Sequence, residues 1–190
     1  IELEKLMGVD AVFRRPAPVA EAEDEPAELA EGDALAEEAD VEAALAEVER
    51  AVMECTKCPL HESRTQGVFS RGRIDSHLMI IGEAPGANED AQGEPFVGRA
   101  GKLLDRMIAA LGLERDEVYI TNILKSRPPG NRDPRPEEIE ACWPYLERQI
   151  DLVAPRVLMT VGKPAANTLL DTNTAMGRLR GRWHEYRSIP

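Results

Sequence analysis

The sequence is poor in cysteine, in aromatic residues and in long apolar runs. No stretch approaches the ~20 consecutive apolar residues of a membrane-spanning helix, and no secretory signal peptide is recognisable, so we expect a cytoplasmic protein without a membrane partner. Three cysteines cannot form a closed set of disulfides, and the Cys-x-x-Cys spacing of Cys55 and Cys58 favours a metal site instead. The G-x-G-x-x-G and Gly-Lys-Ser/Thr patterns are also absent, which excludes the usual dinucleotide and P-loop motifs.

The acidic charge is concentrated at the start of the chain. The formal net charge is -12, and residues 1–50 hold 16 acidic and 4 basic residues, so the rest of the chain is neutral overall. A neutral domain with local basic clusters can still bind a polyanion. Residues 1–39 are rich in Ala, Glu, Asp and Pro and are predicted to be a disordered linker, with an acidic interaction tail as the alternative. Residues 40–190 are predicted to form the domain, and we expect further sequence beyond both ends.

From residue 40 onward, apolar periodicity predicts alternating helices and strands. A first helix begins at Asp40, a plausible N-cap. Gly112 is expected to end the helix that follows the first strand. The expected strands cover 78–81, 118–122, 157–161 and 184–189, and the expected helices after the first cover 100–111, 136–150 and 164–170. Such alternation predicts an α/β fold with a parallel sheet and helices on both of its faces.

Polar residues follow the ends of the first two predicted strands. The first strand runs into Gly82-Glu83-Ala84-Pro85-Gly86, and the second ends at Asn122. Open α/β sheets bind ligands at the carboxyl ends of their strands. The aromatic Phe96 lies in a glycine- and proline-rich loop, so it could stack on a flat ligand whose edge hydrogen-bonds to Asn122. The alternatives are a capping role for Glu83, a turn for Asn122 and core packing for Phe96.

Two loops are rich in basic residues, which suits contacts with phosphate, although solvated surface charge is the alternative. They contain Lys125, Arg127, Arg132 and Arg135 in the first and Arg178, Arg180 and Arg182 in the second. For a metal, Cys142 and His61 would complete a zinc site with Cys55 and Cys58. An iron–sulfur cluster normally requires one thiolate more than this chain has. Unrelated buried thiols remain the alternative.

The motifs of residues 55–190 are long, and they occur in the same order as in a known family. The chain resembles the family 4 uracil-DNA glycosylases, the iron–sulfur branch of the uracil-DNA glycosylase superfamily. The matching segments are Cys55-x-x-Cys58, Gly82-Glu83-Ala84-Pro85-Gly86-x-x-Glu89-Asp90, Gly93-x-Pro95-Phe96-Val97-Gly98, Thr121-Asn122, Lys125-x-Arg127-Pro128-Pro129-x-Asn131-Arg132, Cys142-x-Pro144-Tyr145-Leu146 and Arg180-Gly181-x-Trp183. The resemblance implies a three-layer α/β/α fold with a four-stranded parallel sheet, and hydrolysis of the N-glycosidic bond of uracil in DNA during base excision repair.

The resemblance also implies roles for individual residues. Glu83 would position or activate the attacking water, Phe96 would stack on the flipped uracil, and Asn122 would hydrogen-bond to its Watson–Crick edge. Gly82 and Ala84 would line the same pocket. Phosphate contacts are expected from Lys125, Arg127, Arg132 and Arg180. The implied cofactor is a 4Fe–4S cluster on Cys55, Cys58 and Cys142, with zinc as the alternative, in a protein expected to act as a monomer on uracil-containing DNA.

Two departures from the family pattern affect these expectations. Ser126 occupies the place of the third cluster cysteine, and an alkoxide is a harder and poorer ligand for iron than a thiolate. A cluster completed by Ser126 or water, a 3Fe–4S form and a zinc site are therefore the options. The family's second catalytic motif, a His-Pro segment, would follow Pro190, and His184 does not replace it. We therefore expect residues 1–190 alone to be strongly impaired in catalysis.

Two other functions are compatible with parts of the sequence. One is a member of the superfamily that binds uracil-containing DNA without turnover. Its covalent form is disfavoured, because an arginine-rich insertion would follow the Phe-Val-Gly segment and this chain continues directly to Arg99-Ala100-Gly101. The other is a metal-stapled interaction module that uses the acidic N-terminal tail. That hypothesis leaves the combination of Glu83, Phe96 and Asn122 unexplained.

Overall fold

The computed structural model describes residues 31–190. The linker predicted for residues 1–39 therefore lies mostly outside the described residues. Helix α2 spans Glu31–Met53, so it begins before the predicted start at Asp40 and includes residues 31–39. Asp40 consequently lies inside this helix and is not its N-cap. Among the helices of residues 31–190, none combines the length and the apolar content needed to cross a membrane.

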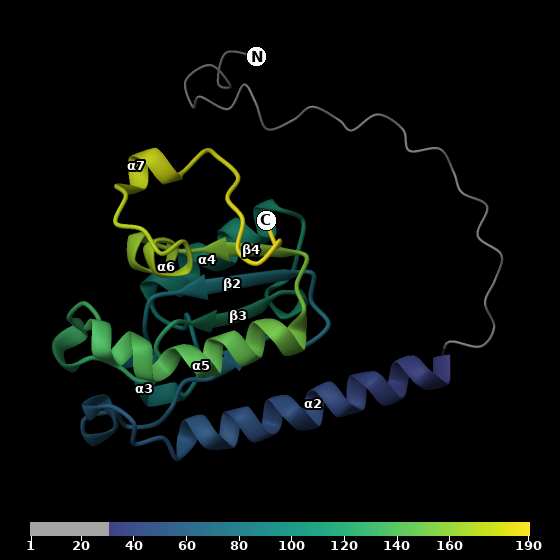
Figure 1. Ribbon diagram of the computed structural model, residues 1–190, viewed down its shortest axis with the longest axis horizontal. Coiled ribbons are helices and arrows are strands. Elements are labelled where there is room, and N and C mark those ends of the chain that lie inside the picture. Colours follow the sequence, from purple (N-terminus) through teal and green to yellow (C-terminus); the bar gives the residue numbers. More distant parts are fainter. Residues whose placement is uncertain (1–30) are drawn as a thin grey trace, which may run out of the picture.

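The centre of the fold is a four-stranded sheet with the strand order β1-β3-β2-β4 (Figure 1). Strand β2 pairs in parallel with both β3 and β4, whereas β1 runs antiparallel to β3. The strands are β1 (Ser70–Arg71), β2 (Leu78–Gly82), β3 (Tyr119–Asn122) and β4 (Val157–Thr160). The predicted α/β class is confirmed, but the sheet is not wholly parallel. The strand predicted at 184–189 is wrong, because this segment forms only an isolated bridge between Tyr186 and Ile189.

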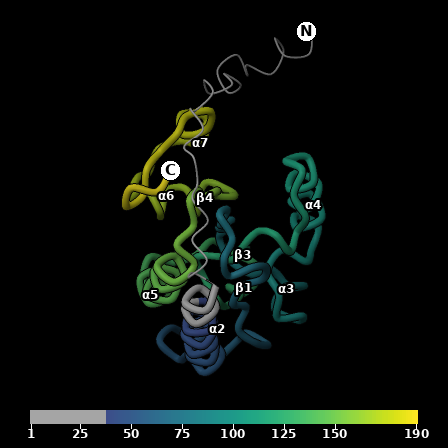
Figure 2. The backbone as a smooth tube through the Cα atoms, turned by 90° about the vertical axis from the view of Figure 1, so that its right-hand side faces the viewer, coloured from purple at the N-terminus to yellow at the C-terminus, as the bar shows by residue number. Residues whose placement is uncertain are grey.

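Helices cover both faces of the sheet, as the three-layer prediction requires (Figure 2). On one face, α4 (Arg99–Ala110) packs Leu104 and Ile108 against Ile80 and Ile120. On the other face lie α5 (Pro136–Val153) and α6 (Lys163–Leu169), whose buried residues pack with Met79 and Ile81. Helix α2 in turn packs on α5. Successive residues of β2 therefore serve opposite halves of the core, which is the expected consequence of the two-residue period of a strand.

Short helices lie in the connections between these elements. They are α3 (Ala87–Gln92), α7 (Met176–Leu179) and the 3₁₀ helices η1 (Pro59–Glu62), η2 (Arg115–Glu117) and η3 (Pro129–Asn131). Of these, α3 and η3 come after the carboxyl ends of β2 and β3, and η2 comes directly before β3. Helix α3 is capped at its start by Gly86, directly after the loop that contains Glu83, and at its end by Gly93, whose φ of 78° is left-handed. A glycine at this position is the usual C-terminal cap, because it adopts positive φ without strain.

Candidate functional site

Strands β2 and β3 place two of the predicted site residues side by side. Gly82 and Asn122 are register partners at the ends of these parallel strands. The pairing continues beyond the strands, where the Ile123 N–H donates to the Gly82 carbonyl (2.9 Å) and the Leu124 N–H donates to the Glu83 carbonyl (3.0 Å). The loop with Glu83 and the segment after Asn122 are thus fixed to each other. The structure therefore brings Gly82, Glu83 and Asn122 to one edge of the sheet.

The side chains of Phe96 and Asn122 converge over the bare α-carbon of Gly82. A Cβ atom built on Gly82 would lie 2.3 Å from the Asn122 Oδ1 atom and 2.4 Å from the Phe96 Cζ atom. Both distances are far below van der Waals contact, so this position admits only glycine. Ala84, which follows Glu83, is partly buried beside the same edge and packs against the core. An aromatic ring and a carboxamide thus lie at a common point.

The carboxamide of Asn122 reaches solvent although the residue is largely buried. The residue is 2% exposed, and its amide atoms are not among the fully buried, unpartnered polar atoms of residues 31–190. No hydrogen bond to the amide is found within these residues, so the amide is open at this edge of the sheet. With one acceptor and one donor, a carboxamide is suited to the edge of a planar base.

Glu83 follows Gly82 and is half-buried at the same edge of the sheet. Burial raises the pKa of its carboxyl group above the usual range, and the negative charge of Asp133 raises it further. Asp133 belongs to the proline- and arginine-rich loop after β3, so that loop also reaches this side of the sheet. A carboxylate with a raised pKa is a better proton acceptor for water than an ordinary glutamate, and such shifts are frequent at catalytic sites.

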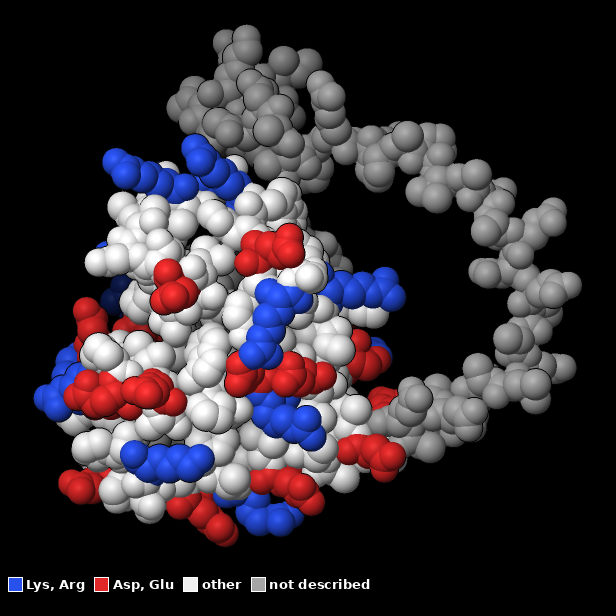
Figure 3. All heavy atoms as spheres, viewed as in Figure 1, with Lys and Arg blue, Asp and Glu red and all other residues white. Residues whose placement is uncertain are grey.

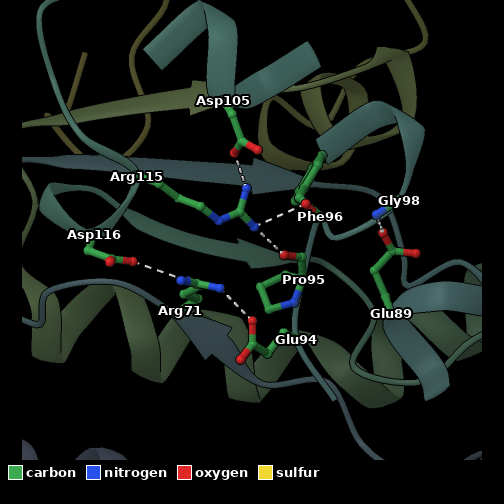
Figure 4. A network of polar contacts seen from close by, with 9 residues as sticks. All are labelled: Arg71, Glu89, Glu94, Pro95, Phe96, Gly98, Asp105, Arg115 and Asp116. Carbon is green, nitrogen blue, oxygen red and sulfur yellow. Dashed lines mark hydrogen bonds and ion pairs between the residues drawn. The ribbon is translucent and has the colours of Figure 1, made fainter. Parts of the chain in front are cut away.

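Glu89 ties the loop with Glu83 to the loop with Phe96 (Figure 4). Its Oε1 atom accepts the Gly98 N–H (2.7 Å), and its Oε2 atom accepts the Gly86 N–H (3.1 Å). The second bond is half of a capping box at the start of α3. This role of Glu89 was not predicted, although a glutamate three residues after a cap position is the sequence pattern of a capping box.

The predicted metal ligands come together beside the segment that follows β3. The side chains of Cys55, Cys58, Cys142 and Ser126 line one small hollow, and His61 lines it too. The Cys142 Sγ atom accepts the Lys125 N–H (3.2 Å), and the Arg64 guanidinium donates to Ser126 Oγ (2.9 Å). Within residues 31–190, however, no three His, Cys, Asp or Glu side chains are gathered closely enough to hold a metal ion as they stand.

The chemistry of this donor set fits a cluster held mainly by thiolates. Burial raises the pKa of the Cys58 and Cys142 thiols, so without a cation both favour the protonated form. A metal displaces such protons when it binds. Sulfur donors with an N–H bond to one sulfur are typical of iron–sulfur sites. The His61 Nδ1–H donates to the Cys58 carbonyl (2.7 Å), so this ring nitrogen is already used.

Lys125 is not placed to contact DNA. Its side chain is buried, and its ammonium donates to the Thr121 hydroxyl (2.6 Å) and to the Asn122 carbonyl (2.7 Å). Burial lowers the pKa of this ammonium to about 7, against a smaller opposing effect of Cys142. The ammonium has no open path to a phosphate, so the predicted phosphate contact is wrong. Instead, Lys125 supports the backbone at the end of β3.

The predicted arginines differ in how free their guanidinium groups are. Arg132 forms two bonds with the buried carboxylate of Glu138 (2.9 and 2.5 Å), which also caps α5 by accepting the Arg135 N–H. Arg127 donates to the exposed Asn131 side chain (2.7 Å). Arg180 is exposed just after α7, where basic side chains extend from the surface (Figure 3). Arg127 and Arg180 therefore remain the better candidates for phosphate contacts.

Comparison with known proteins gives one consistent family. The model of the uracil DNA glycosylase superfamily matches residues 69–190. The type-4 uracil-DNA glycosylase of Archaeoglobus fulgidus is 48% identical over 140 residues, which cover 72% of this chain and 70% of the relative. The enzyme of the same name from Sulfurisphaera tokodaii is 55% identical over 113 residues, 59% of this chain and 51% of the relative. That from Thermotoga maritima is 43% identical over 131 residues, 68% of each chain. The chain thus spans between half and seven tenths of the length of these relatives.

Proposed function

The chain belongs to the uracil DNA glycosylase superfamily, and we propose that it hydrolyses the N-glycosidic bond of uracil in DNA as a base excision repair enzyme. The observation that supports this most directly is the convergence of Phe96 and Asn122 over Gly82, one residue before Glu83. A ring, a free carboxamide and a carboxylate at the end of parallel strands form a site for a flat polar base. The substrate would be uracil-containing DNA, bound by a monomer.

Recognition would require the base to leave the helical stack. A base inside a duplex is inaccessible, so enzymes of this kind extrude the nucleotide into a pocket and recognise the flipped base there. Phe96 would stack on one face of uracil, and the Asn122 amide would pair with its polar edge. The missing side chain of Gly82 leaves room for the ring and the amide to lie next to each other at this edge.

Hydrolysis would then depend on charges that develop in the transition state. Positive charge grows on the sugar as the bond breaks, and a fixed carboxylate next to it is stabilising. Glu83 would also orient the water that attacks the sugar and accept its proton, which its raised pKa favours at neutral pH. Negative charge grows on uracil, where the Asn122 amide N–H would donate to it.

The test is an excision assay with the chain as described. Oligonucleotides with a single uracil, and matched ones with thymine, are incubated with the protein, and abasic sites are detected by alkaline cleavage. We expect cleavage of the uracil strand only, at the low rate predicted from the sequence, with a further strong loss for Glu83→Gln. Tight binding of the uracil strand without any release of uracil would overturn the hydrolase proposal and support a binding protein.

We further propose that Cys55, Cys58, Cys142 and Ser126 hold an iron–sulfur cluster, with zinc as the competing metal. When bound, this group would cross-link the end of α2, the segment after β3 and α5, and it would have a structural effect. The Arg64 guanidinium would stabilise Ser126 as the oxygen ligand through its hydrogen bond to Oγ. No reaction step requires the cluster.

Metal content and visible absorption decide between the two metals. Protein purified without oxygen should be coloured and contain iron, and Ser126→Cys should increase its resistance to chelators, because thiolate is the softer ligand. Ser63→Cys is the matched control, since Ser63 lies beyond η1 and does not line the hollow. Colourless protein with stoichiometric zinc would overturn the iron–sulfur assignment and leave the glycosylase proposal intact.

A further inference from the structure

The backbone of Phe96 has a conformation that an aromatic residue rarely adopts. Its φ angle is 57°, which is left-handed, and it is the one aromatic residue with positive φ in the described part of the chain. A bulky residue is strained in this region and remains there only when its surroundings impose it. In this backbone conformation the ring lies on Gly82 and packs against the part of the core that contains Ile80 and Leu104.

Arg115 fixes this conformation from a distant part of the chain (Figure 4). Its Nη2 atom donates to the carbonyl oxygens of Pro95 (2.7 Å) and Phe96 (3.0 Å), and its Nη1 atom is held by Asp105 of α4. These two carbonyl groups belong to the peptide planes on either side of the Phe96 α-carbon. Because peptide planes are rigid, fixing both of them fixes φ and ψ together.

Close packing holds the same peptide from the opposite direction. A Cβ atom built on Gly101 would lie 1.6 Å from the Phe96 carbonyl oxygen, so that oxygen rests directly on the first turn of α4. The Arg115 side chain is only 17% exposed. An exposed arginine–aspartate pair alone would contribute little. The two bonds to carbonyl oxygens are what distinguish Arg115 from such a pair.

We propose that Arg115 is a positioning residue for the stacking ring, acting on the base through the backbone of Phe96. The consequence for catalysis rests on the proposed function, whereas the effect on the ring does not. Without the guanidinium, the strained backbone would relax, and the ring would leave its place above Gly82. A lysine would restore the charge but, with one ammonium in place of a planar fork, would not hold both carbonyls in the same way.

Fluorine NMR tests the effect on the ring without any activity. The phenylalanines, Phe13, Phe69 and Phe96, are replaced by 4-fluorophenylalanine, and the Phe96 resonance is identified by its loss in Phe96→Leu. Arg115→Met should shift or broaden this resonance and leave that of the buried Phe69 unchanged. Arg73→Met, which removes an exposed pair with Asp75, is the control and should change neither. An unchanged Phe96 resonance in Arg115→Met overturns the proposal. If the Phe69 resonance also shifts, Arg115→Met has disturbed more than the Phe96 ring. The same comparison of the two resonances is then made with Arg115→Lys.

A double-mutant cycle tests the consequence for uracil excision. Arg115→Met should slow single-turnover excision by about 10- to 100-fold, the usual effect of small misplacements at a site. The same change should have almost no effect in a Phe96→Ala background, because the two residues act through one ring. An undiminished effect in that background overturns the role of the ring. Absence of excision by the unmodified chain contradicts the proposed function instead, and the NMR result still stands.

Discussion

Gly82 and Asn122 face each other across two parallel strands at the carboxyl edge of the sheet. Since a Cβ on Gly82 would meet both the Asn122 amide and the Phe96 ring, this pair defines the floor of the proposed base pocket. The strands that form it are the most buried in the sheet. The floor is therefore rigid, and the four predictions that follow concern this pocket and its surroundings.

Gly82→Ala should abolish most uracil excision while the protein still folds. The new methyl group would displace the Asn122 amide or the Phe96 ring, and a misplacement of this size costs about 100-fold in rate. Single-turnover rates and thermal midpoints measured together would show it. Gly177→Ala is the matched control, because a Cβ there meets no atom within 4 Å. Equal rates for the two variants would contradict the pocket as described.

Asp133→Asn should move the acid limb of the pH–rate profile to lower pH. The active form of Glu83 is the carboxylate, and its raised pKa means that activity is lost at a higher pH than for an ordinary glutamate. Burial is the larger cause of the rise, and Asp133 is the second. Removing the Asp133 charge lowers the pKa of Glu83, although burial keeps it above the usual value. Asp151→Asn, at the far end of α5, should leave the limb in place. An acid limb at the same pH in Asp133→Asn as in the unchanged protein would exclude an effect of the Asp133 charge on the pKa of Glu83.

Glu138→Gln should destabilise the fold by about 2 kcal/mol, the usual loss for hydrogen bonds to a charged group. The Glu138 carboxylate is 1% exposed and accepts two bonds from Arg132 and one from the Arg135 N–H. Urea denaturation at neutral pH measures the loss. Glu137→Gln changes an exposed neighbour in the same helical turn and should cost almost nothing. Similar midpoints for both variants would show that the buried ion pair makes no net contribution.

Arg127→Met and Arg180→Met should each weaken the salt dependence of DNA binding. Every lost phosphate contact lowers the slope of log K against log salt by about 0.9 on duplex DNA. Lys125→Met should leave that slope unchanged, because its ammonium binds Thr121 and Asn122. Fluorescence anisotropy at several salt concentrations measures all three slopes. A reduced slope in Lys125→Met would mean that the lysine reaches DNA after all.

The long periodic elements could be predicted from the sequence, whereas the short ones could not. The runs that became β2, β3 and β4 are apolar and bounded by turn residues, and α4 and α5 have clear helical periods. Strand β1 has two residues and exists only because β3 offers an edge to pair with. Its antiparallel direction is set by tertiary contacts that no local pattern contains. The segment 184–189 has strand-like composition but finds no strand to pair with along its length.

The site shows the same division at the level of single residues. Glu83, Phe96 and Asn122 could be proposed from motifs, since each stands at a strand end or in a glycine-rich loop. The burial of Lys125 could not, because a lysine in a basic loop has the composition of a surface residue. Arg115 was also missed, since its acceptors are backbone carbonyls of residues 95 and 96, and nothing in the sequence marks a carbonyl.

The central place of β2 in the sheet also bears on how the protein folds during synthesis. Its partner β3 is synthesised next, after α3, α4 and η2, so the half of the sheet with the proposed base pocket can pair first. Its other partner, β4, is made much later, and until Thr160 has left the ribosome one edge of β2 stays open. Non-local parallel pairing is slow, and open strand edges invite association between chains. The nascent protein should therefore depend on chaperones most strongly in the interval between the synthesis of α4 and that of β4.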